Sequence, residues 1–115
     1  MKGFSFVIET FETEETARFL AAISIGLLKS VLCGVMSLDE AERLLFTPRT
    51  SKVLRDKGLS PEICDLVMEC CELEDVLSLV PLKFEEELLR MIGEFSNFLK
   101  KTEAQDPYEV HTDLR

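Results

Sequence analysis

The sequence lacks the motifs that usually identify small catalytic, metal-binding or phosphate-binding domains. Its five glycines are scattered, so no glycine-rich loop is present to cradle a phosphate. The four cysteines form no C-x-x-C pair, and the single histidine, His111, lies near the C-terminal end. Zinc sites need paired ligands at short spacing, and a catalytic thiol needs a base within hydrogen-bond reach. We therefore expect no metal, no cofactor and no enzymatic activity.

The sequence also has little positive charge. It contains 13 lysines and arginines against 22 aspartates and glutamates, which gives a net charge of −9. Proteins that bind nucleic acids or anionic membranes present a basic face, so we expect neither kind of partner. An acidic surface favours solubility, and it also suits a protein partner of basic charge.

The N-terminal residues lack the uninterrupted apolar region of a signal peptide, and they soon become acidic. The most membrane-like stretch, residues 19–36, contains Lys29 and has neither basic clusters nor an aromatic belt at its flanks. We interpret it as a buried helix and not as a membrane span. Together with the absence of a disulfide pattern, these features predict a cytoplasmic protein.

The cysteines are Cys33, Cys64, Cys70 and Cys71. We expect all four to be reduced thiols that are buried as small apolar residues. A metal or redox role for the last three remains an alternative hypothesis.

A chain of 115 residues can bury one hydrophobic core without disulfides or metals. Its patterns are mainly helical. We predict a compact bundle of four to five helices around an apolar central helix, forming one domain over residues 1–101, with a C-terminal tail over residues 102–115. From N-caps, first-turn prolines and glycine stops, the expected helices span 13–33, 37–46, 48–58, 60–80 with a break around 71–74, and 83–101.

Two helices show clear buried faces. The apolar residues of the last helix follow steps of three and four, namely Phe84, Leu88, Met91, Ile92, Phe95, Phe98 and Leu99. In the fourth helix the expected buried residues are Ile63, Leu66, Val67 and Cys70, continued less regularly by Leu73, Val76, Leu77 and Val80. We also expect Val53 and Leu54 to face inward, and the apolar run before Pro81 to dock onto the central helix.

Both ends of the chain alternate between apolar and polar residues, as strands do. Phe4, Phe6 and Ile8 share one side of the first segment, and the tail from Tyr108 to Leu114 has the same period. Because a lone strand must pair, the first segment is expected to pair either with the tail or with its copy in a homodimer. We favour the homodimer.

Four carboxylates, spaced three, four and three residues apart, form a row on one helix face, and a fifth lies one step further. The row is Glu62, Asp65, Glu69, Glu72 and Asp75. Like charges at these spacings repel, so either a basic partner or basic residues elsewhere in the fold must compensate them. The row is the candidate partner-binding site of a non-enzymatic protein–protein interaction module. Alternatives are an immunity-type inhibitor of a basic toxin, a mimic of nucleic-acid charge, and the cysteine-based protein above.

Two segments carry a resemblance to a known family. "SLDEAERLLFTPRT" (residues 37–50) and "ELEDVLSLVPLKFEE" (residues 72–86) resemble the motif regions of a domain-of-unknown-function family of small bacterial cytosolic proteins, and the preceding "ISIGLLKSVLCGVM" also fits it. The resemblance covers about Phe4 to Leu99. It implies a stand-alone cytosolic domain, and it brings no assigned activity and no catalytic residue.

Overall fold

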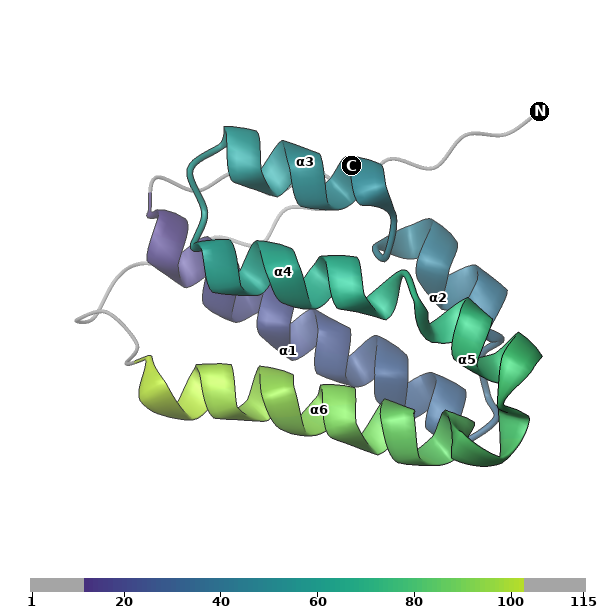
Figure 1. Ribbon diagram of the computed structural model, residues 1–115. Coiled ribbons are helices and arrows are strands. Elements are labelled where there is room, and N and C mark those ends of the chain that lie inside the picture. The colour runs from purple at the N-terminus through teal and green to yellow at the C-terminus, as the bar shows by residue number, and fades with distance from the viewer. Residues whose placement is uncertain (1–11, 103–115) are drawn as a thin grey trace.

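The computed structural model describes residues 12–102 of the chain (Figure 1). Within this part the chain forms six α-helices and one short 3-10 turn. They are α1 (Thr13–Leu32), α2 (Leu38–Leu44), α3 (Pro48–Asp56), α4 (Pro61–Cys70), α5 (Leu73–Leu79), η1 (Pro81–Lys83) and α6 (Phe84–Lys101). The predicted strand at residues 4–8, the tail, and their pairing all lie outside the described residues.

The helix boundaries follow from local chemistry. Ser37 Oγ accepts a hydrogen bond from the Glu40 backbone N–H at 3.1 Å, and Thr47 caps α3 in the same way. Gly34 and Gly58 adopt φ values of 75° and 83°, which glycine tolerates best. At the C-terminal ends of α1 and α3, 6→1 and 5→2 backbone hydrogen bonds complete a Schellman motif. Gly34 and Gly58 therefore end these helices as predicted.

Helices α1 and α6 run antiparallel and pack along most of their length, while α4 contacts α6 on one side and α3 on the other (Figure 1). The start of α1 is fastened to the end of α6 by Arg18, whose guanidinium donates to the backbone oxygen of Leu99 at 2.8 Å and to Thr102. The chain therefore closes on itself at one end of the bundle.

One hydrophobic core joins these helices. The predicted buried face of α4 is confirmed, and in α6 Leu88, Met91, Phe95 and Phe98 are buried, with Phe84, Ile92 and Leu99 packed at the core edge. Other core residues are Ala17, Leu20, Ala21, Leu28, Leu38, Ala41, Leu45, Phe46, Leu59 and Leu73.

The predicted mainly helical fold is confirmed. The break expected around residues 71–74 is the turn at Cys71 and Glu72, which divides the predicted helix over 60–80 into α4 and α5.

The expected enclosure of the first helix is also wrong. One face of α1 is open to solvent, and Phe19 on this face is 48% exposed. The open face also carries the small residues Ala22 and Gly26, so an apolar pattern around a helix does not show that the helix is completely buried.

Two further inward-facing predictions fail. Val53 is exposed, because α3 contacts the bundle on one side only, through Ser51 and the half-buried Leu54. The apolar run before Pro81 does not dock onto α1: Leu77, Leu79 and Val80 are exposed.

Two buried serines allow a matched test of the packing. Ser51 Oγ donates to the backbone oxygen of Cys64 at 3.0 Å and joins α3 to α4. Ser24, in α1, is fully buried, and its hydroxyl has no hydrogen-bond partner among the described residues. We expect Ser51→Ala to lower the free energy of unfolding by about 1 kcal/mol, and Ser24→Ala to leave it unchanged or raise it by about 0.5 kcal/mol.

Urea unfolding of both variants measures the difference. Each substitution places alanine in a helix, so the gain in helix propensity is common to both. An equal loss of stability in the two variants would contradict the assignment of the Ser51 hydrogen bond.

Candidate functional site

Three of the five carboxylates in the predicted acidic row are paired within the protein. They bind basic side chains from the two helices that flank α4. The pairs are Glu62 Oε1 with Lys101 Nζ at 2.6 Å, Asp65 Oδ1 with Arg55 Nη2 at 2.9 Å, and Glu69 Oε2 with Arg90 Nη1 at 3.5 Å. Of the two ways to compensate the row, these residues use basic groups of the fold, and they connect α4 to α3 and α6.

Glu72 and Asp75 differ from the other three members of the row. The turn after Cys70 redirects the chain, so these two residues belong to the start of α5 and not to the face of α4. Neither has an ion-pair partner within the part of the chain that the structure describes. The structure thus divides the predicted site at the helix break.

A second group of carboxylates, not predicted from the sequence, lies where α2 approaches α5. The Glu42 side chain of α2 is partly buried there, and its Oε1 atom is buried without a hydrogen-bond partner. Burial, followed by the nearby charges of Glu74, Asp39 and Asp75, raises the pKa of Glu42. Hydrogen bonding with the Glu74 carboxyl also raises this pKa, because a bond between two carboxyl groups requires one of them to be protonated.

We define the α2–α5 acidic surface as Glu42, Glu72, Glu74 and Asp75. The sequence gives no signal for it, because Glu42 and Glu74 are brought together only by the tertiary packing of two short helices.

Next to this surface is a ridge of exposed apolar side chains. We define the α5–η1 ridge as Leu77, Leu79, Val80 and Leu82. Leu79 is 78% exposed and Leu82 is 98% exposed. Pro81 ends α5 because the residue before a proline disfavours the helical conformation, and Val80 adopts φ −139° and ψ 62°. The chain then turns through η1 directly into α6, so these side chains point away from the core.

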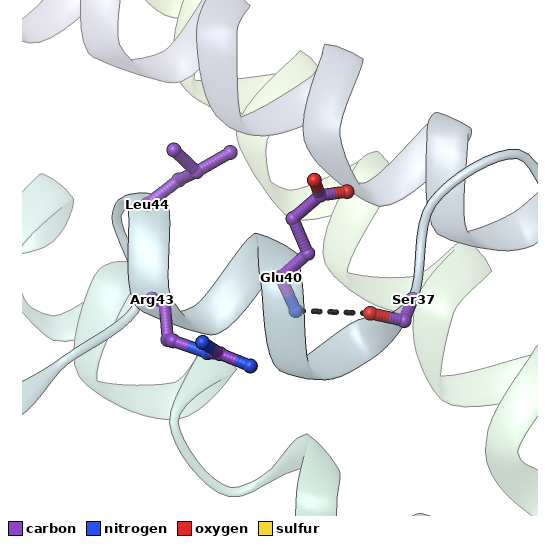
Figure 2. A pocket seen from close by; sticks show the side chains of 4 residues that line it. All are labelled: Ser37, Glu40, Arg43 and Leu44. Atoms are coloured by element: carbon purple, nitrogen blue, oxygen red, sulfur yellow. Dashed lines mark hydrogen bonds between the residues drawn. The ribbon is translucent and has the colours of Figure 1, made fainter. Parts of the chain in front are cut away.

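A hollow on α2 is lined by Ser37, Glu40, Arg43 and Leu44 (Figure 2). The Ser37 hydroxyl already accepts the capping hydrogen bond, and Arg43 is bonded to Asp39, with Nε to Oδ2 at 2.9 Å. The Glu40 side chain points away from Ser37 in the same view. No nucleophile and base meet among these four residues, so the hollow offers no arrangement for covalent catalysis.

The cysteines occupy three environments. Cys64 and Cys70 are buried, Cys71 is half-buried, and Cys33 is exposed, so the prediction of four buried thiols is wrong for Cys33. The pKa values of Cys64, Cys70 and Cys71 are raised, mainly by burial.

Among residues 12–102 no group of three or more His, Cys, Asp or Glu side chains is placed to hold a metal ion. None of the helices in this range is sufficiently long and apolar to cross a membrane.

These environments predict a graded reactivity of the thiols. With iodoacetamide at pH 8, we expect Cys33 to be alkylated first, Cys71 more slowly, and Cys64 and Cys70 only when the fold opens, because a buried thiol resists ionisation. Peptide mass spectrometry over time measures each site, and Cys33→Ser should remove the fast phase. Rapid modification of Cys70 in the folded protein would contradict the burial described above.

The raised pKa of Glu42 predicts a pH-dependent gain in stability on neutralising this residue. Its ordinary pKa is 4.5, and the folded state raises it, so the ionised form destabilises the fold at neutral pH. Because solvent screens this partly exposed carboxylate, we expect Glu42→Gln to raise the free energy of unfolding by only about 0.5 kcal/mol at pH 7. The gain should shrink as the pH falls toward 4.5, where wild-type Glu42 takes up a proton.

Thermal unfolding at several pH values tests this. Glu40→Gln is the matched control, since Glu40 is exposed on the same helix. A gain for Glu42→Gln that does not change with pH would show that charge is not its cause.

Among the comparisons with known proteins, the one with protein families finds a match. No curated protein and no solved structure matches the chain. A family model described as a protein of unknown function, DUF3969, matches residues 11–111, which include every described helix. The predicted resemblance to an uncharacterised family is thereby confirmed, and the chain belongs to the DUF3969 family of proteins of unknown function.

Proposed function

We propose that the protein is a non-enzymatic protein–protein interaction module, which holds a basic partner at the α2–α5 acidic surface. The observation that carries the proposal is the uneven compensation of its carboxylates. The acids of α4 are neutralised by Lys101, Arg55 and Arg90. Those of the α2–α5 acidic surface form no ion pair with any described basic residue, and Glu42 is partly buried among other acids.

The repulsion among these carboxylates provides the driving force for binding. Two adjacent like charges cost tenths of a kcal/mol on a helix surface, and more where burial reduces the screening by solvent. A lysine or arginine from a partner relieves this cost when it approaches. The negative electrostatic potential of these carboxylates also accelerates encounter with a basic protein, and salt weakens this acceleration.

The acids of α4 are excluded from this role for the same physical reason. A partner that bound Glu62, Asp65 or Glu69 would have to displace a basic side chain of the protein itself. Such an exchange gains little, since one ion pair replaces another. The proposed contact residues are therefore Glu72 and Asp75 from the original acidic row, together with Glu42 and Glu74.

Charge reversal tests the proposal against net charge alone. The surface variant is Glu72→Lys with Asp75→Lys. The control variant is Glu40→Lys with Asp56→Lys, which changes the net charge by the same amount at exposed positions of α2 and α3 that form no ion pair with a described residue. The probe is a polar basic peptide of alternating lysine and serine. We expect the surface variant to weaken binding about tenfold or more, and the control variant about twofold.

Fluorescence anisotropy with labelled peptide measures both affinities, at low salt and at about 0.15 M salt. Wild-type binding should weaken as salt rises. Equal losses in the two variants would mean that the peptide responds to net charge and that no localised site exists. Absence of binding by the wild type at low salt would also overturn the proposal.

A further inference from the structure

The α5–η1 ridge is unusual because four exposed, large apolar side chains lie within six consecutive residues, 77–82. Single exposed apolar residues are common on protein surfaces, whereas a contiguous group marks a contact surface. Leu79 and Leu82 are the two most exposed leucines of the described residues, and Leu77 and Val80 beside them are 42% and 45% exposed.

The backbone beneath the ridge is fixed by hydrogen bonds. The Val80 N–H donates to the Val76 oxygen at 2.8 Å, and the Lys83 N–H donates to the Val80 oxygen at 2.9 Å. Leu73 anchors the start of α5 in the core, and η1 continues directly into α6. A hydrogen-bonded turn thus holds these leucines at the surface, outside the hydrophobic core.

The charges near the ridge indicate which kind of partner segment can bind it. Glu74 and Asp75 precede the ridge, Glu85 and Glu86 follow it, and all four are exposed. Lys83 is the one basic residue between Gly58 and Glu87. An occupant complementary to this pattern has apolar side chains in the middle and basic side chains toward both ends.

The same charges argue against this chain as its own occupant. The sequence after Thr102 contains four acids and one arginine, so it would meet carboxylates of its own sign. A second copy of the ridge would bring the same four acids against each other. The first eleven residues contain one lysine and one glutamate, and so do not supply the basic flanks.

We infer that the α5–η1 ridge is the apolar anchor of the proposed interaction, and that the partner segment is a basic amphipathic peptide whose apolar side chains cover Leu79 and Leu82. This inference rests on the proposed function and adds the chemistry of the partner. The acidic surface accelerates encounter and aligns the segment. The ridge then supplies the salt-insensitive part of the affinity, since burial of apolar surface does not depend on charge screening.

The test compares two peptides of equal charge on the full-length protein. One is the lysine–serine peptide, and in the other leucines replace some serines at helical spacing. The ridge variant is Leu79→Ser with Leu82→Ser. The control variant is Val35→Ser with Val53→Ser, which removes exposed apolar side chains elsewhere. Thermal unfolding checks that each variant is folded, as expected for exposed positions.

We expect the wild type to prefer the leucine-containing peptide by about tenfold or more, corresponding to burial of at least one leucine side chain. The ridge variant should lose this preference, keep its affinity for the lysine–serine peptide, and keep the same dependence on salt. The control variant should behave as the wild type.

The two proposals fail in different ways. If the lysine–serine peptide binds through Glu72 and Asp75 but leucines add nothing, the ridge is not an anchor and the proposed function stands. If the ridge and control variants lose the preference for the leucine-containing peptide equally, the peptide binds exposed apolar side chains nonspecifically, and the inference is also overturned. If neither peptide binds the wild type, the proposed function fails, and the anchor fails with it.

Discussion

The antiparallel contact between α1 and α6 is the constraint on which the remaining structure depends. It joins two segments near opposite ends of the chain, and the Arg18 guanidinium fixes their register by bonding the carbonyl of Leu99 at the end of α6. The α4 helix can bury its apolar face only because this pair offers a continuous surface. Helix α3 is in turn held on α4 by Ser51 and by the Arg55–Asp65 pair. The order of dependence thus runs from the long helices outward, to the short ones that carry the proposed contact surface.

The parts of this fold that local chemistry controls could be predicted from the sequence. The buried face of α6 follows from steps of three and four, and the ends at Gly34 and Gly58 follow from the conformational freedom of glycine. The exposure of Val53 and Leu77 could not be predicted, because apolar periodicity identifies a face without showing whether another helix covers it. The acidic row shows the same limit. The spacing places Glu62, Asp65 and Glu69 together on α4, yet only the positions of α3 and α6 decide which carboxylates meet a basic side chain.

The division of the row changes the interpretation of the acidic composition. Part of the negative charge fastens helices together through ion pairs, and part is gathered at the α2–α5 acidic surface, where burial and neighbouring acids disfavour the charged form of Glu42. Natural proteins retain such locally unfavourable arrangements chiefly at sites of function. The toxin-inhibitor and nucleic-acid-mimic hypotheses remain predictions, and each would use this same surface. The described cysteines provide no metal site, and His111 lies outside the described residues.

The short length of α5 has a consequence for the dynamics of the domain. The helix has seven residues between the turn at Cys71 and Glu72 and the stop at Pro81, and Leu73 is its one fully buried side chain. The free energy that holds it closed is therefore small compared with that of α1 or α6, each of which contributes at least four residues to the core. Amide hydrogens of α5 should exchange with solvent through a local opening that leaves the long helices intact. The exposed leucines at the end of this helix are therefore presented in the arrangement described only while α5 is closed.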